Sequence, residues 1–514
     1  MNLNSTLPLS LWAFVAAIGV NAQPGTLDPT FNGGGVEILQ PGAVHDVGHE
    51  VIALPDSTTL VCGTANVNGT NSAFVMHLME DGQVDPGWGM NSGYTFLTVG
   101  LEAYAYDMAV DASGNIYLCG LTYTTLDHSD VLVVKLLPDG SPDDAFGTNG
   151  IVVVPIGTGD AEAQGIAVQD DGKTIVAGHV GFGDAADGMI MRLKTDGNVD
   201  GGFGAGGMAI TTAYPGIEDA FQAVDVLDDG SIMAAGDAVV DFLFRAIVAK
   251  VDGAGVFVTA FDGDGVAEPL LPGTEHRCWG ILGEGTGAYI CGQVDIDATN
   301  RDLFVAKVKE DGTLVGDYGT SGVAATDVNE NDIAYDIAQQ ADGKIVVCGT
   351  TGSFGFLVPR DFIIARYNPT GVLDDTFGSG GTTATDIQPD FDDANGVDIQ
   401  EPSGKILVTG FTAGSDNDLV VARYLGDDAS TGVAAVPALN GVMAVYPNPA
   451  ASVLYLDRTL RAGDRLSITD AAGRSVLQPV VAQRAIDVSG LPTGMYWISL
   501  ITNEGTAHVP FVKE

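Results

Sequence analysis

The sequence predicts an all-β protein, a seven-bladed β-propeller of four-stranded blades followed by a small Ig-like β-sandwich. The first observation is an aromatic residue in a Gly-rich motif that returns at intervals of 57 to 59 residues. The second is that each interval contains four short patterns typical of β-strands. The third is the composition, with 70 Gly and few helix-favouring runs among 514 residues. The seven returning aromatic residues are Phe31, Trp88, Phe146, Phe203, Phe261, Tyr318 and Phe377.

Within one repeat, four strands can be placed in order. The first follows the Gly-rich motif, as in residues 150–154, and the second is seen at residues 163–168. An Asp-Gly pair then predicts a tight hairpin turn, because both central residues of that turn need positive φ. The third and fourth strands, seen at residues 344–349 and 361–367, are nearly continuous apolar runs.

Apolar runs of this length predict strands that are covered on both faces. A single four-stranded sheet leaves its faces open, whereas sheets stacked in a ring cover one another and leave few exposed edges. We expect the first strand of the first repeat to complete the last blade and so close the ring. An open β-solenoid is the competing architecture, although its coils are usually shorter.

The net charge of −46 is unevenly distributed along the chain. Residues 442–514 contain six acidic and six basic residues, so the whole excess lies upstream of them. Such an asymmetry marks a domain boundary. A strongly acidic chain is a poor partner for nucleic acid or an anionic membrane, because both carry negative phosphates. We expect a monomer that binds no nucleic acid.

The predicted domain organisation begins with a signal peptide at residues 1–22. An apolar run from Leu7 to Val20 ends in small residues, which is typical of a secretory signal. The alternative is a membrane anchor, for which the run is short. The remaining domains are the repeats at residues 23–425, a Gly-, Ala- and Pro-rich linker at residues 426–441 and the sandwich at residues 442–514.

Five cysteines are too few for a disulfide framework. Four of them stand just before the Gly that ends a recurring strand, where a small buried side chain is expected. Cys278 lies one hairpin arm away from Cys291, so these two either form a disulfide or remain buried thiols. The register of the hairpin decides between these alternatives.

Residues that recur at one place in most repeats are predicted to be scaffold, because a single ligand site needs no copy in every blade. The connections between the first and second strands, and between the third and fourth, differ from repeat to repeat and are acidic. In an antiparallel blade they share one face, so we expect any ligand there. Alternatively, these acids only keep an exported protein soluble. The candidate binding residues on this face are Asp160, Glu162, Glu218, Asp219, His276, Arg277, Trp279, Asp295, Asp297, Asp392 and Asp393.

Two smaller groups of residues point to specific chemistry. His276, Arg277 and Trp279 stand where other repeats carry Ala or apolar residues, and a polar, aromatic cluster beside a propeller channel is suited to contact a sugar. The alternative is ordinary packing with an exposed Arg. No cofactor is predicted, but Ca²⁺ is kept as an alternative at Asp327, Asn329 and Asn331, whose spacing begins like a calcium loop. The loop then departs from that pattern, because it lacks the Gly and the final Glu.

Enzyme signatures are mostly absent from the sequence. It contains neither a His-Glu-x-x-His zinc helix nor a Gly-x-Ser-x-Gly elbow. The function favoured by these observations is an exported binding module with an unknown ligand, a glycan or a surface protein. One alternative is an enzyme that processes carbohydrate or peptide with acidic residues of the variable face. Another is a structural, adhesin-like coat protein.

Two parts of the chain resemble known families. The motifs Gly-x-Leu-Asp-x-x-Phe-Gly, Asp-Gly-Lys-Ile-Val-Val and Asp-Phe-x-x-Ala-Arg-Tyr resemble the delta-60 repeat of bacterial propeller-like proteins. This resemblance implies a fold and little about function.

The tail contains Tyr-Pro-Asn-Pro, Asp-x-x-Gly-Arg and Leu-Pro-Thr-Gly-Met-Tyr, and it resembles the type A sorting domain of the type IX secretion system. Pro510 departs from that family near the end of the chain. The resemblance implies export from a Gram-negative bacterium to the outer surface or the medium, and recognition of residues 442–514 by the secretion machinery.

Overall fold

The computed structural model is built from β-strands and describes residues 23–181, 186–211, 218–353, 358–414 and 416–427 of the repeats. In the tail it describes residues 445–446, 452–456, 465–470, 475–481, 485–502 and 505–513. Across these ranges no helix is present that is long and apolar enough to cross a membrane. The chain divides into two compact units, residues 1–428 and residues 429–514. The predicted signal peptide lies outside the described residues.

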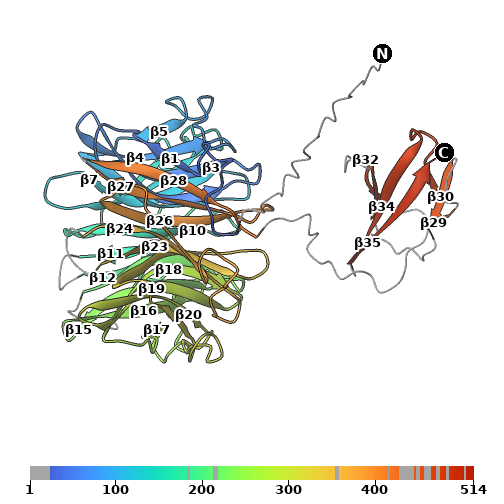
Figure 1. Ribbon diagram of the computed structural model, residues 1–514. Coiled ribbons are helices and arrows are strands. Elements are labelled where there is room, and N and C mark those ends of the chain that lie inside the picture. Colours follow the sequence, from blue (N-terminus) through green and yellow to red (C-terminus); the bar gives the residue numbers. More distant parts are fainter. Residues whose placement is uncertain are drawn as a thin grey trace, which may run out of the picture. The chain divides into compact units, whose positions relative to one another are not determined.

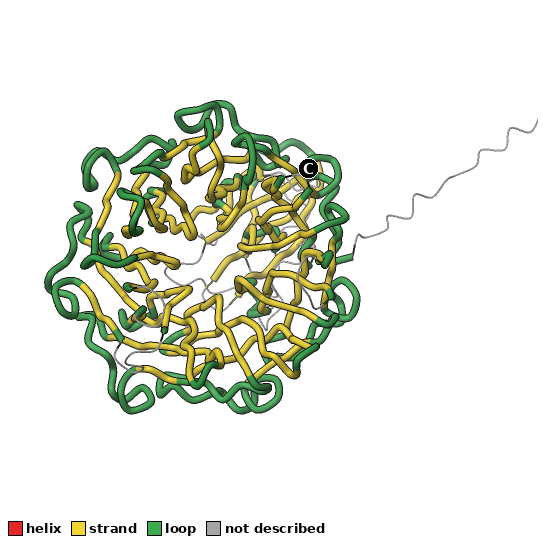
Figure 2. The backbone as a smooth tube through the Cα atoms, turned by 90° about the vertical axis from the view of Figure 1, so that its left-hand side faces the viewer, coloured by secondary structure: helices red, strands yellow, loops and turns green. Residues whose placement is uncertain are grey.

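The repeats form four-stranded antiparallel groups, each of which we call a blade, and Figure 2 shows them arranged as a ring around a central axis. Four blades are separate sheets: β2 to β5, β6 to β9, β10 to β13 and β14 to β17. Three more, β18 to β21, β22 to β25 and β26-β27-β28-β1, belong to one twelve-stranded sheet. Single parallel pairs, Arg301 with Asn331 and Arg360 with Phe391, join these three blades. The prediction of an all-β propeller with four-stranded blades is confirmed.

Each blade has the same strand order from the axis outward. The inner strands are β2 (Val47–Ala53), β6 (Glu102–Val110), β10 (Ala161–Val168), β14 (Asp219–Val226), β18 (Glu275–Glu284), β22 (Asn331–Gln339) and β26 (Phe391–Gln400). The second strands are β3 (Thr59–Val67), β7 (Ile116–Tyr123), β11 (Thr174–Val180), β15 (Ile232–Val240), β19 (Gly287–Asp297), β23 (Ile345–Gly352) and β27 (Lys405–Ala413). The third strands are β4 (Thr70–Leu78), β8 (Asp130–Leu136), β12 (Asp187–Leu193), β16 (Leu243–Val251), β20 (Asn300–Val308), β24 (Arg360–Tyr367) and β28 (Asn417–Tyr424). The outer strands are β5 (Tyr94–Leu97), β9 (Ile151–Val154), β13 (Met208–Ile210), β17 (Val266–Ala267), β21 (Val323–Thr326), β25 (Thr382–Thr385) and β1 (Val36–Leu39).

The first outer strand closes the ring. β1 pairs antiparallel with β28, from Val36 opposite Ala422 to Leu39 opposite Leu419. Figure 1 shows the blue β1 beside the orange β28, so the two ends of the repeat region meet in one blade. This pairing confirms the expected completion of the last blade by the start of the repeats.

Buried ion pairs on one face of the ring explain the recurring acidic and basic residues. We call this the turn face, because it carries the tight turns between inner and second strands; the opposite face is the loop face. The Arg423 Nε donates to Oδ2 of Asp28 at 2.9 Å, and both side chains are only 1% exposed. The Arg423 guanidinium also lies over the ring of Phe31, 4.8 Å from its centroid. The predicted scaffold role of these recurring residues is confirmed at this position.

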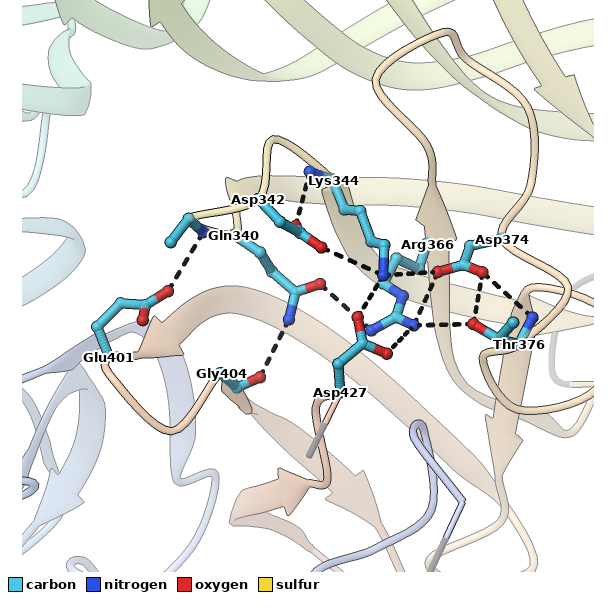
Figure 3. Close-up of polar contacts among 10 residues, drawn as sticks. Gln340, Asp342, Lys344, Arg366, Asp374, Thr376, Glu401, Gly404 and Asp427 are labelled. Carbon is cyan, nitrogen blue, oxygen red and sulfur yellow. Dashed lines mark hydrogen bonds and ion pairs between the residues drawn. The ribbon is translucent and has the colours of Figure 1, made fainter. Parts of the chain in front are cut away.

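The same arrangement closes the preceding blade, with one difference. Arg366 pairs with Asp374 at 2.8 Å and also with Asp427 at 2.7 Å, as Figure 3 shows. Asp427, which also contacts Lys344, is the last described residue of the propeller. A side chain at the end of the repeat region thus adds a second carboxylate to this buried arginine.

Two repeats lack the recurring Asp, because Val258 and Val315 stand in its place. There the basic residue turns to other acceptors. Lys250 donates to the carbonyl of Thr286 at 2.7 Å, and Lys307 pairs with Glu284. The recurring basic residue therefore keeps a polar partner in these two blades, although the partner is a different one.

The tail forms two small sheets. One is β29 (Val445–Tyr446), β30 (Val453–Leu456) and β33 (Ala485–Asp487). The other contains β32 (Ser475–Val481), β31 (Arg465–Asp470), β34 (Gly494–Thr502) and β35 (Gly505–Lys513), in that order. Pro510 lies in β35, an edge strand, where the missing backbone N–H removes no inter-strand hydrogen bond that the sheet requires.

Candidate functional site

The candidate site is a cavity of about 640 Å³ on the axis of the ring. All seven inner strands contribute residues to its wall. The wall extends to Val110 and Gln339, the last residues of β6 and β22, so the cavity reaches toward the turn face. A volume of this size is typical of sites for small ligands.

Every inner strand carries a β-bulge at the same level. A bulge adds one residue to one strand and re-aims its side chain. All seven added residues are polar or aromatic and all line the cavity. We call them the bulge ring: His49, Tyr106, Gln164, Gln222, Trp279, Tyr335 and Asn395.

A glycine on the second strand of each blade makes room for the bulge. In β23, a Cβ atom on Gly349 would lie 1.9 Å from the carbonyl oxygen of Ile333, two residues before the bulged Tyr335. The same 1.9 Å approach recurs in all seven blades. The seven glycines are Gly63, Gly120, Gly178, Gly236, Gly292, Gly349 and Gly410. A side chain there would collide with the inner strand, so glycine permits the close approach that the bulge needs.

The bulge ring combines flat aromatic surfaces with hydrogen-bonding groups. His49 and Tyr106 meet edge to face at 5.4 Å, and Trp279 and Tyr335 do so at 5.7 Å. Among the described residues, no acceptor lies within hydrogen-bond distance of the buried Trp279 Nε1. Burial lowers the pKa of His49 to about 4, so its imidazole is neutral at physiological pH.

Five carboxylates line the cavity on the turn-face side of the bulge ring. Glu50, Asp107 and Asp336 each follow a bulged residue directly, and Asp225 and Asp398 lie three residues after one. Burial raises the pKa of Asp107 and of Asp336 to about 7, and that of Asp398 to about 6. Burial, and then the Asp336 and Asp107 carboxylates, raise the pKa of Glu50.

The four aspartates connect neighbouring inner strands. Asp107 accepts a hydrogen bond from the backbone N–H of Ile166 at 2.7 Å, and Asp336 does so from that of Val397 at 2.7 Å. Asp225 accepts from the N–H of Gly283 at 2.7 Å, and Asp398 from that of Ala53 at 2.8 Å. Each carboxylate therefore satisfies a donor on an inner strand edge that no further strand covers.

Glu50 differs from these aspartates. Its carboxylate accepts a hydrogen bond from the adjacent backbone N–H of Val51 at 3.0 Å. Within the described part of the chain, no hydrogen bond joins it to the neighbouring strand β6. The Glu50 carboxylate therefore does not connect two blades by a hydrogen bond among the described residues.

Of the eleven candidate residues on the variable face, only Trp279 lines the cavity. Arg277 lies outside it, stacks on Trp279 at 4.7 Å and pairs with Asp237 at 3.3 Å. Asp393 pairs with Arg360 and Asp295 with Arg301, so these acids have partners within the protein.

The remaining candidates on that face are dispersed. Asp160 accepts from the N–H of Ser129, and Asp297, at an exposed turn, from that of Thr299. Glu162 contacts Ser129 and Gln164. His276, Asp219 and Asp392 are buried, whereas Glu218 is exposed. The structure does not gather these residues into one site.

The predicted calcium ligands have other contacts. The Asn331 amide oxygen accepts a hydrogen bond from Arg301 at 3.1 Å, and the Asn329 amide donates to Thr351 at 3.2 Å. The pKa of Asp302 is raised by burial and by Asp327 and Asp332, so Asp327 lies in a group of carboxylates instead. One blade further, Asp361, Asp386 and Asp392 bring carboxylate oxygens within 4.8 Å of one another.

All five cysteines are buried free thiols in the structure. Cys278 lies opposite Gly292, and Cys291 lies opposite Gly280, because the bulge at Trp279 shifts the register between them. The disulfide alternative considered for Cys278 and Cys291 is not formed.

The closed ring of four-stranded blades and the second, smaller β-rich unit define a β-propeller protein with an additional C-terminal domain. Residues 444–514 match the family described as a secretion system C-terminal sorting domain. Residues 169–203 and 340–377 match a β-propeller domain of unknown function, DUF5122. The chain therefore carries a DUF5122 β-propeller, as its delta-60-like repeats predicted, and a C-terminal sorting domain.

The sorting domain defines the destination of the protein. It marks the chain for the type IX secretion machinery, with which the tail interacts, and for the cell surface or extracellular space of a Gram-negative bacterium. The predicted localisation is confirmed.

Similar solved structures share little sequence with this chain. A crystal structure of Sqt1 from Chaetomium thermophilum has 11% identity and a TM-score of 0.40, and covers 76% of this chain and 89% of that one. Sqt1 bound to the N-terminus of the ribosomal protein L10 has 8% identity and a TM-score of 0.39, and covers 76% and 98%. No curated protein matches the chain.

Proposed function

We propose that the protein is an exported binding module that takes a glycan into the central cavity. The observation that carries this proposal is the bulge ring. Its backbone geometry repeats in every blade, but its side chains are of five types, His, Tyr, Gln, Trp and Asn, all polar or aromatic. A scaffold position would repeat its residue, whereas a ligand site needs different groups around one molecule.

The chemistry of the ring suits a saccharide. Trp279 and Tyr335 offer ring faces and edges against which the C–H groups of a sugar pack. The amides of Gln164 and Gln222 supply donors and acceptors for hydroxyl groups. A mixed apolar and hydrogen-bonding wall is typical of a small-molecule site.

Binding of oligosaccharides to the full-length protein tests this proposal, first on a glycan array and then by titration in solution. The Trp279→Leu variant is expected to bind at least about tenfold more weakly, because aromatic residues dominate such contacts. Phe242→Ala is the matched control, since Phe242 is an aromatic residue that is 97% exposed at the turn between β15 and β16 on the loop face. Loss of binding in Phe242→Ala with retention in Trp279→Leu would contradict the cavity as the site.

Catalysis on the bound glycan is a second candidate, favoured by the raised pKa values of Asp107 and Asp336. A glycosidase needs one carboxyl group that is protonated at neutral pH and a second that is ionised. However, both aspartates also accept backbone hydrogen bonds that connect blades, which accounts for them without catalysis. Product analysis after prolonged incubation distinguishes the two functions.

A further inference from the structure

The cavity wall holds acidic groups without a basic side chain beside them. Five carboxylates line it, and no Lys or Arg is found among the described residues of its wall. The imidazole of His49 is neutral, because burial holds its pKa at about 4. Burial raises the pKa of Glu50, Asp107 and Asp336 and so disfavours their ionised form. A cation that enters the cavity offsets this penalty, so the wall favours a positively charged ligand group.

The carboxylates are arranged for an extended cation rather than a single metal ion. Among the described residues, the one group of three metal-ligating side chains within 4.8 Å is Asp361, Asp386 and Asp392, outside the cavity. The five cavity carboxylates come from five different inner strands: β2, β6, β14, β22 and β26. Carboxylates spread around a cavity suit ammonium groups carried on a larger molecule, because such a molecule can reach more than one carboxylate.

Glu50, Asp107 and Asp336 form the part of this wall nearest the bulge ring, because each follows a bulged residue in the chain. Asp107 and Asp336 use carboxylate oxygens to connect blades, but each carboxylate has lone pairs beyond those bonds. Glu50 is the least engaged of the three. An ammonium group has three donors, so each amino group of a larger ligand can bind one of these carboxylates and still donate to a neighbouring acceptor.

We propose that the cavity binds a saccharide bearing free, protonated amino groups, with the ammonium groups directed to Glu50, Asp107 and Asp336 and the sugar rings against the bulge ring. This inference rests on the proposed glycan-binding function and names the class of sugar. The neutral bulge ring, with its amide and aromatic groups, holds the hydroxyl-bearing part of the sugar. The carboxylates on the turn-face side of the bulge ring select for the amine.

Calorimetric titration of the full-length protein compares three probes: an oligomer of glucosamine, the same oligomer fully N-acetylated, and spermidine. The glucosamine oligomer is expected to bind at least about tenfold more tightly than the other two. N-acetylation removes the charge and keeps the sugar, whereas spermidine keeps the charge and lacks the sugar. Glu50→Gln is expected to weaken glucosamine binding about tenfold and to leave the N-acetylated oligomer unaffected.

Asp297→Asn replaces a carboxylate by an amide at an exposed turn outside the cavity and is expected to change nothing. Asp336→Asn repeats the charge test from another strand if Glu50→Gln lowers the amount of folded protein. Equal binding of both oligomers would overturn the inference and leave the proposed function standing. Equal binding of spermidine would overturn the sugar requirement, and failure of every oligosaccharide would overturn both proposals.

Discussion

The carboxylates of the turn face and those of the cavity differ in what surrounds them. Asp28 and Asp374 lie beside buried arginines, and although burial opposes ionisation, hydrogen bonds and these cations lower the pKa of each to about 2. Asp107 and Asp336 have no cation, and burial raises the pKa of each to about 7. The difference separates acids that are paired with a cation of the protein from acids that accept only backbone hydrogen bonds.

The comparison also shows how repetition separates scaffold from site. The acid–base pair of the turn face recurs in most blades and is replaced by another contact where it is missing. The cavity acids occur in five of the seven inner strands and at two different levels. Acidic residues that occur at irregular positions on a repeating backbone are expected at the binding site of one asymmetric ligand. Such a ligand lacks the symmetry of the ring and contacts each blade differently.

The largest effect is expected from breaking the turn-face pair that closes the ring. Arg423→Met leaves Asp28 buried, with Lys405 as its remaining basic partner. Removal of one partner from a buried pair typically costs about 3–5 kcal/mol, and we expect a loss of this order in the free energy of unfolding. Denaturant unfolding of the full-length protein, followed by circular dichroism, measures it.

Arg192→Met is the matched control for this variant. Its partner Asp200 is only 8 residues away in the chain, so this pair does not join the two ends of the repeats, and the two side chains are 10% and 13% exposed. Water can compensate part of that loss, so a clearly smaller effect is expected. Equal losses in both variants would show that closure of the ring by β1 and Asp28 contributes no special stability.

The next effect in size concerns the backbone that presents the bulge ring. Gly349→Ala places a methyl group against the carbonyl of Ile333 and forces β22 away from β23. Overpacking of this kind costs about 1–3 kcal/mol, and it also re-aims Tyr335. Thermal unfolding and the near-ultraviolet circular dichroism of the aromatic residues measure the two consequences.

Gly316→Ala serves as the control, because a Cβ there has no atom within 4 Å. It is expected to leave both signals unchanged. If Gly349→Ala were as stable as Gly316→Ala and kept the same aromatic spectrum, the bulge would not depend on the glycine of the second strand.

The sequence predicted the repeat, the strands and the scaffold pairs, because their patterns recur in the chain. It placed the candidate binding residues on the loop face, where composition varies most, and of these Trp279 alone lines the cavity. His49, Tyr106 and Gln222 also line the cavity but were not among the candidates, because a polar residue on an inner strand is ordinary in a single repeat. The recurring glycine before the end of each second strand was the available signal, but its meaning depends on cross-strand register, which a sequence does not supply.

The smallest effect is a change in pH dependence, and it has opposite signs in the two regions. The pKa of Asp336 is about 7 in the folded protein and near its ordinary value of 3.8 in the unfolded chain. A raised pKa means that the folded state holds its proton more tightly. The resulting stability is therefore fully present below about pH 4 and is lost as the pH rises through about 7.

Asp336→Asn removes this titration, so the stability of the variant relative to the wild type is expected to rise by about 1 kcal/mol between about pH 6 and pH 8. Asp374→Asn is the counterpart on the turn face. Its pKa of about 2 contributes stability above about pH 4 that is lost as the pH falls toward 2, so the variant differs most from the wild type at neutral pH. Denaturant unfolding of both variants across this range measures the two slopes. If the difference in stability between Asp336→Asn and the wild type did not depend on pH, the Asp336 carboxylate would have a compensating cation. The proposed preference of the cavity for a positively charged ligand would then be wrong.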